Sequence, residues 1–269
     1  RAMEDKKRAR AIKKDEQSGT TVEDEGDSKR VQDLLRRRRH IVLLVQNQTG
    51  LNNLFKLVSE SYKPENYYRY PRVDYALLEK YNEGIIAASA CLGGVYAGCY
   101  WENREEGDEA VVAAMRETTE QMQSIFGDRW YAELQWNGVP EQHALNQHII
   151  QVAQERDVKL ISTADSHYYN KSAWKDRELY IRLGWLGKGR PSWAEGSELP
   201  VDVEEVGYEL YPKNGDEMWA SYQHYAEKAE LEYDDALVLE SIEETHRIAF
   251  ERIEDFLPDN TVRLPSFVV

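Results

Sequence analysis

The strongest constraint on the fold is an alternation of short apolar runs with longer amphipathic segments from residue 40 onwards. The apolar runs, each short enough for a single strand, are 40–47, 84–90, 130–136 and 158–166. Apolar strands that alternate with helices are typical of a mainly parallel sheet with helices packed against it. We therefore predict an α/β fold, in which ligand and catalytic groups gather at the carboxyl ends of the strands.

Helical periodicity separates and follows these runs. The predicted helices are 49–62, 74–81, 106–127, 140–157, 173–184, 215–229 and 236–253. Thr49 is the expected N-cap of the first helix, Pro140 suits the first turn of its helix, and Gly127 ends the long one. One more short strand is predicted at 208–211.

The charge balance restricts the function classes. The 269 residues carry a net charge of −15, from 34 basic and 49 acidic residues, which argues against a free-standing binder of duplex DNA but not against a module tethered to one. Cys91 and Cys99 do not suggest a disulfide scaffold. There is no run of ~18 apolar residues and no signal peptide, so we expect a cytoplasmic protein with no membrane partner.

Residues 1–39 differ from the rest, with 13 basic and 9 acidic residues and almost no large apolar ones. This composition predicts a charged, partly disordered leader or a surface insertion. The four arginines at 36–39 are weak evidence for phosphate contacts beside so acidic a chain.

Two residues at the end of the fourth apolar run carry the clearest chemical signal. Asp165 and His167 are two apart, and residues i and i+2 of a strand share a face. A carboxylate and an imidazole on one face suit a divalent ion such as zinc or manganese. On this motif alone the alternative stays open that the pairing occurs by chance and that the histidine only makes ordinary hydrogen bonds.

Three further residues are weaker candidates. Cys91 follows the second run, as an inert buried cysteine or as a thiolate ligand. His40 opens the first run, as a surface histidine or as a ligand. Glu133 alternates with apolar residues, which is compatible with a side chain that points inward. His224 and His246 lie in polar helices and are expected to be solvated. No phosphate-binding loop, dinucleotide fingerprint, CxxC, HExxH or GxSxG motif occurs.

The order of three segments carries a family resemblance. "HIVLLVQNQTGLNNLFKLVSESY", "YYRYPRVDYALLEKYNEGIIAASACLGG" and "FGDRWYAELQWNGVPEQHALNQHIIQVAQERDVKLISTADSHYYN" resemble, in this order, the polymerase and histidinol phosphatase (PHP) domain of bacterial DNA polymerase III alpha subunits. The resemblance covers residues 40–269. It implies a distorted (β/α)7 barrel, present here as a partial barrel over 40–255, with 256–269 as a linker towards a polymerase palm.

The same resemblance implies a metal site. Active members hold up to three metal ions with His, Asp, Glu and often one Cys. The ligand positions of the family fall on His40, Cys91, Asp165 and His167 of this sequence. Zinc or manganese is the expected ion, with magnesium as the alternative.

One departure from the family is large. Its first ligands come from a His-x-His strand, a Thr-Asp-His turn and an acidic residue on the following strand, and none of these occurs here. The expectation is a fragment, a split gene or a degenerate domain, and the 269 residues alone are expected to lack nuclease activity.

Three functions follow from the resemblance. The first is part of a replicative DNA-directed DNA polymerase, a nucleotidyltransferase, whose PHP domain is a metal-dependent 3′–5′ exonuclease. Its expected partners are the rest of the polymerase chain, primer–template DNA, the sliding clamp and other replisome subunits. The second is a non-catalytic PHP module that braces the polymerase. The third, and least favoured, is a stand-alone phosphoesterase.

Overall fold

The structure is a computed structural model that describes residues 38–186, 207–258 and 261. Residues 1–37 of the expected leader and most of the expected linker at 256–269 lie outside the described residues. The chain divides into two compact units. The first contains residues 43–86 and the segment from Phe250 on, and the second contains 39–42 and Ala87–Ala249.

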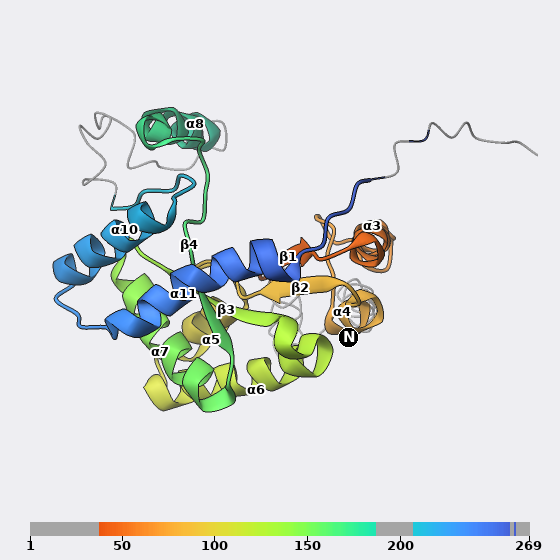
Figure 1. Cartoon of the computed structure of the whole chain (residues 1–269), viewed down its shortest axis with the longest axis horizontal. Coiled ribbons are helices and arrows are strands. Elements are labelled where there is room, and N and C mark those ends of the chain that lie inside the picture. The colour runs from red at the N-terminus through yellow and green to blue at the C-terminus, as the bar shows by residue number, and fades with distance from the viewer. Residues whose placement is uncertain (1–37, 187–206, 259–260, 262–269) are drawn as a thin grey trace, which may run out of the picture. The chain divides into compact units, whose positions relative to one another are not determined.

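The described residues form a mixed α/β structure, which confirms the predicted fold class at that level (Figure 1). The four strands, in the sheet order β1-β2-β3-β4, are β1 (Val42–Val45), β2 (Ile85–Ala88), β3 (Trp130–Gln135) and β4 (Lys159–Thr163). The eight α-helices described are α3 (Gln48–Ser61), α4 (Tyr75–Tyr81), α5 (Val95–Asn103), α6 (Asp108–Phe126), α7 (Pro140–Arg156), α8 (Trp174–Leu186), α10 (Gly215–Lys228) and α11 (Asp235–Arg247). A closed barrel is not among these elements, so the partial barrel stays a prediction.

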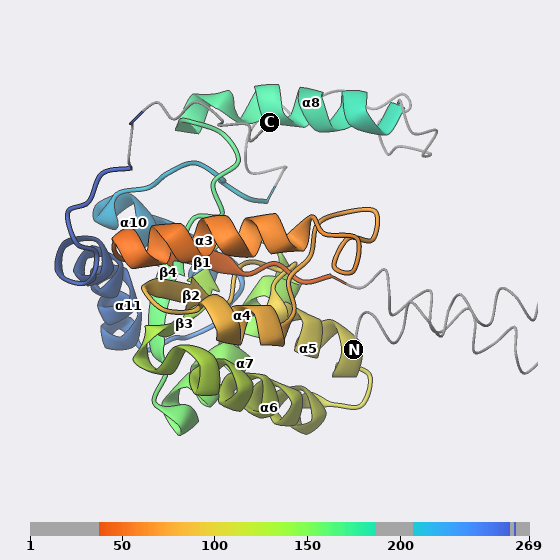
Figure 2. The same ribbon diagram turned by 90° about the vertical axis from the view of Figure 1, so that its right-hand side faces the viewer.

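Parallel pairing organises the second unit. Ala87 and Ala88 of β2 pair in parallel with Trp130 and Tyr131 of β3, and β3 pairs in parallel with β4 over five residues. All residues of β2 and β3 are buried, as expected for strands covered on both faces. Helix α11 packs along β4 and α7 packs against β3, while α6 and α7 lie together below β3 in Figure 2.

The helix ends explain where the sequence prediction succeeded. Pro140 is at the first turn of α7, and Gly127, with a φ of 58°, ends α6, both as predicted. Asn214 and Glu217 form a capping box at the start of α10.

Two local predictions were wrong, and one helix was missed. The N-cap of α3 is Asn47, not Thr49, because the Asn47 side chain accepts the Gly50 amide at 3.0 Å. Residues 208–211 form no strand; Leu210 instead uses its backbone oxygen to accept the amides of His167 and Tyr168. Helix α5 was missed because three of its nine residues are small, so its sequence shows no clear helical periodicity of apolar residues.

In the first unit, the end of β1 is held by backbone bonds. The Gln46 amide donates to the Gly84 oxygen at 2.8 Å, and the Gln46 oxygen accepts the Glu254 amide at 2.8 Å. Gly50 lies so close to Gly84 that a Cβ on Gly50 would overlap the Gly84 carbonyl. Only glycine fits this approach of α3 to the turn before β2.

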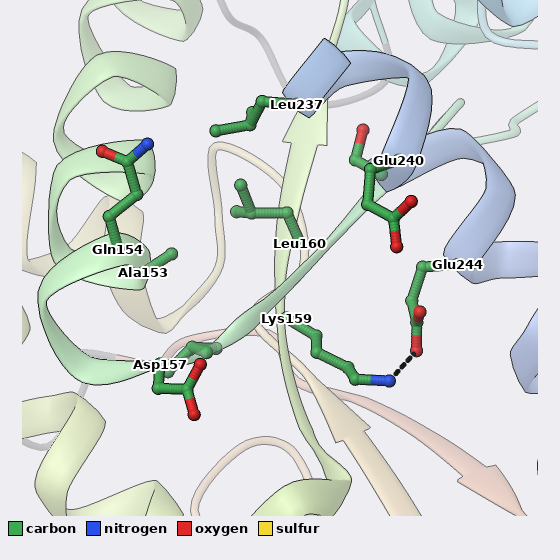
Figure 3. Close-up of a pocket in the computed structure, with 10 residues that line it drawn as sticks. Ala153, Gln154, Asp157, Lys159, Leu160, Leu237, Glu240 and Glu244 are labelled. Atoms are coloured by element: carbon green, nitrogen blue, oxygen red, sulfur yellow. Dashed lines mark hydrogen bonds and ion pairs between the residues drawn. The ribbon is translucent and has the colours of Figure 1, made fainter.

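The second unit also contains a cavity of about 250 Å³ at the start of β4. Figure 3 shows Leu160 and Leu237 in it, with Lys159 reaching Glu244 at 2.7 Å. Glu244 is buried at 2% exposure and also accepts a bond from Arg247 at 2.8 Å. Burial by itself would raise the pKa of Glu244, but the bonds from Lys159 and Arg247 outweigh it and lower that pKa below its ordinary value.

We expect Gly50→Ala to destabilise the protein by about 1–3 kcal/mol or more, because backbone must move to admit the methyl group. The matched control is Gly184→Ala, where a Cβ meets nothing within 4 Å and lies inside α8. There the gain in helix propensity should stabilise by up to about 1 kcal/mol. Chemical denaturation measures the change in unfolding free energy for both variants. Equal effects of the two substitutions would contradict the close contact between Gly50 and Gly84.

We expect Glu244→Gln to lower stability at pH 7 by about 1–3 kcal/mol, because it removes charge-assisted bonds to Lys159 and Arg247. A carboxylate with a lowered folded-state pKa stabilises the fold above its unfolded pKa of about 4.3, and that contribution is lost as pH falls through the folded value. The difference between wild type and variant should therefore shrink in acid. Exposed Glu243, changed to Gln, should leave the pH profile of unfolding unaltered.

Candidate metal site at the strand ends

The candidate site lies at the carboxyl ends of β2, β3 and β4, in the second unit. Cys91 follows β2 by three residues, Glu133 lies in β3, and Asp165 and His167 follow β4. Parallel pairing puts these three strand ends at one edge of the sheet. The candidate residues therefore lie at or near the strand ends, while their function stays a prediction.

Glu133 connects the three strand ends. Its carboxylate is buried, with one oxygen accepting the Ala90 amide at 2.8 Å and the other accepting the Thr163 hydroxyl at 2.7 Å. The Glu133 amide in turn donates to the Ser89 hydroxyl at 2.8 Å. Burial raises the pKa of Glu133 although both bonds oppose the shift, and the charge of Asp165 adds to it. Glu133 is thus a buried carboxylate that needs positive charge nearby to ionise cheaply.

His40 and Cys91 form the first donor pair. The His40 amide donates to the Gly93 oxygen at 2.9 Å, and His40 forms a parallel bridge with Gly94. This places His40 Nδ1 3.7 Å from Cys91 Sγ. Zn–S and Zn–N bonds of about 2.3 and 2.0–2.1 Å at a tetrahedral angle separate the two donors by about 3.5 Å. The pair therefore fits two neighbouring ligands of one ion.

The surroundings of Cys91 disfavour the thiolate form of its side chain. Burial raises its pKa, and the charges of Asp165 and Glu133 raise it further, against a bond from the Gly93 backbone. The two carboxylates are thus within electrostatic reach of the sulfur. A cation between these groups would reverse the effect and favour the thiolate.

Asp165 and His167 form the second pair, by a geometry other than the predicted one. Strand β4 ends at Thr163, and Asp165 has a φ of 46°, so the two residues lie in a turn and not on one strand face. His167 Nδ1 lies 2.6 Å from the backbone oxygen of Asp165 and 3.9 Å from its Oδ2. A proton on Nδ1 satisfies that carbonyl and leaves Nε2 as the lone-pair nitrogen, the tautomer of many metal-binding histidines.

The backbone on both sides of the site is strained. Ala90, beside Cys91, has a φ of 62°, and Asp165 has one of 46°. Non-glycine residues in this region cost of order 1–3 kcal/mol and persist where their surroundings hold them. Ala90 is held by Glu133, whose carboxylate accepts its amide. Such strain concentrates at functional sites.

The structure therefore brings together His40 with Cys91, and Asp165 with His167. Within residues 38–186 and 207–258 it places no group of three or more His, Cys, Asp or Glu close enough to hold an ion. The four side chains supply two pairs of atoms that suit a divalent ion, but they do not form a complete coordination sphere. The roles of the four residues stay predictions.

Sequence reasoning noted Glu133 but did not include it among the site residues. Its signal is a carboxylate within a mainly apolar strand, because a carboxylate is almost never fully buried without partners. His224 and His246 are exposed, as predicted, and neither cysteine forms a disulfide.

Comparison with known proteins identifies the family of this chain. The family model "PHP domain" matches residues 9–137. The DNA polymerase III subunit alpha of Aquifex aeolicus is 45% identical over 131 residues, covering 49% of this chain and 11% of the relative. The same subunit of Borreliella burgdorferi is 32% identical over 228 residues, covering 85% and 17%. That of Deinococcus radiodurans is 36% identical over 192 residues, covering 71% and 13%.

The chain thus spans about a tenth to a sixth of the length of these relatives. In the described part of the chain, no helix is both long and apolar enough to cross a membrane. PHP domains generally depend on metal, which supports a divalent ion as the cofactor of this one. The chain carries a PHP domain and is related to the alpha subunits of bacterial DNA polymerase III.

Proposed function

We propose that this chain is part of the alpha subunit of a replicative DNA polymerase, in which its PHP domain acts as a metal-dependent 3′–5′ exonuclease. The observation that supports it best is the meeting of three strand ends around Glu133, with a His–Cys pair and an Asp–His pair beside it. Nitrogen, sulfur and carboxylate donors suit zinc or manganese, with magnesium as the alternative.

In this proposal His40, Cys91, Asp165 and His167 hold the metal, and Glu133 sets their spacing. A bound divalent ion would lower the pKa of a water molecule and neutralise charge on a phosphodiester. The Nδ1–H of His167 donates to the Asp165 backbone oxygen, which leaves the lone pair of Nε2 to bind the metal. Glu133 keeps Ala90 and Thr163 in place and so fixes the residues that follow each.

The second candidate is a PHP module that braces the polymerase without catalysis. It is favoured by the absence of any group of three donors among the described residues. A stand-alone phosphoesterase is less favoured. In either of the first two cases the partners are the rest of the polymerase chain, primer–template DNA, the sliding clamp and other replisome subunits. A role in replication also implies a cytoplasmic location.

The exonuclease is tested in the complete gene product with Asp165→Asn. The amide keeps the shape of the side chain but loses its charge, so bound metal should fall, and degradation of a mismatched primer 3′ end should drop at least tenfold. Metal content is measured by elemental analysis and degradation on gels. Asp176→Asn, an exposed change in α8, is the control. Undiminished degradation in Asp165→Asn would exclude the catalytic role, and an intact protein without metal would favour the brace.

The role of Glu133 is tested by two variants. Glu133→Ala leaves the buried Ala90 amide without its acceptor and should cost about 1–3 kcal/mol. Glu133→Gln keeps an acceptor for that amide and should cost less than half as much. Added zinc or manganese should raise the melting temperature of wild type more than that of Glu133→Gln, because only the carboxylate attracts the ion. Equal shifts in both proteins would support the brace.

A further inference from the structure

Two adjacent tyrosines beside the candidate site have opposite environments. Tyr168 is half-buried, its ring stacks on Tyr211 with centroids 6.4 Å apart, and its hydroxyl accepts the Leu210 amide at 2.8 Å. Tyr169, the next residue, is 77% exposed. Tyr168 therefore supports the segment, and Tyr169 presents an aromatic ring to solvent two residues after His167.

The backbone that carries Tyr169 is held on both sides. Before it, the amides of His167 and Tyr168 both donate to the Leu210 oxygen, at 2.8 and 3.2 Å. After it, the Asn170 side chain accepts the amides of Ser172 and Ala173 at 3.0 and 3.1 Å. An exposed ring on a fixed backbone loses little conformational entropy when a planar group stacks on it.

The charge of this segment differs from that of the chain. Residues 167–175 contain two lysines and no carboxylate, in a chain of net charge −15. Lys171 is well exposed, although its ammonium lies 3.1 Å from Glu209. Exposed Lys175 lies with its ammonium 5.3 Å from the centre of the Trp174 ring. Aromatic rings interleaved with lysines are the pattern that binds single-stranded nucleic acid, because bases stack and phosphates pair.

We propose that Tyr169, with Lys171 and Lys175, forms a stacking platform for the terminal base of a single-stranded 3′ end beside the candidate metal site. This inference rests on the proposed exonuclease, whose substrate it specifies: an unpaired end, whose base is free to stack, and not a duplex end. Every base has an aromatic face, so the platform tolerates sequence and selects for the unpaired state.

The test uses the complete gene product and a single-stranded DNA oligonucleotide with 2-aminopurine at its 3′ terminus, a base whose fluorescence is quenched when it stacks. Binding is measured in EDTA, which prevents degradation. Tyr169→Ala should reduce the quenching of 2-aminopurine fluorescence on binding and weaken binding about fivefold or more. Tyr169→Phe keeps the ring and should behave as wild type. In the metal-loaded protein, Tyr169→Ala should raise KM for degradation more than it lowers kcat.

Tyr180→Ala is the matched control, because Tyr180 is equally exposed, at 78%, but is not part of the segment 167–175. It should leave quenching unchanged. If Tyr169→Ala shows the same quenching and the same KM as wild type, the platform is overturned. Normal degradation in that variant would leave the proposed exonuclease standing. Tyr169-dependent quenching in a protein that does not degrade 3′ ends would support the platform and reject the exonuclease.

Discussion

The buried carboxylate of Glu133 is the interaction on which the candidate site depends. It accepts the Ala90 amide after β2 and the Thr163 hydroxyl at the end of β4, from a position inside β3. One side chain therefore fixes the relative positions of the segments that carry Cys91 and Asp165. Glutamine, the neutral residue of the same size, has a single acceptor oxygen, so only a carboxylate accepts both of these donors.

The same bonds explain why strained backbone is tolerated here. Ala90 and Asp165 both have a positive φ. Ala90 immediately precedes the candidate ligand Cys91, and Asp165 is itself a candidate ligand. Hydrogen bonds from outside the turn hold Ala90 and His167, the former through Glu133 and the latter through Leu210. The segment around Leu210 thus replaces the strand predicted there and supports the Asp165–His167 turn from a distance of more than 40 residues in sequence.

The elements of the fold were predictable, because hydrophobic periodicity and end signals are local. All four strands and seven of the eight α-helices described lie where periodicity placed them. The errors arose where a distant contact decides. Asn47 displaces Thr49 as the cap where α3 approaches Gly84, and 208–211 gives its bonds to the turn after β4. For the site, the strand ends were predictable, but the central place of Glu133 required the register between β2, β3 and β4.

The electrostatics of the strand ends favour a cation. Burial raises the pKa of Glu133 and of Cys91, and the charge of Asp165 opposes ionisation of both. Burial and the neighbouring charge thus both oppose the ionised forms of Glu133 and Cys91. A divalent ion removes this conflict, because each anionic group then lowers the energy of the ion and is itself stabilised by it. Binding of an ion and ionisation of Glu133 and Cys91 would therefore be coupled. That coupling links the hydrogen bonds of Glu133, which define the site, to the charge that would occupy it.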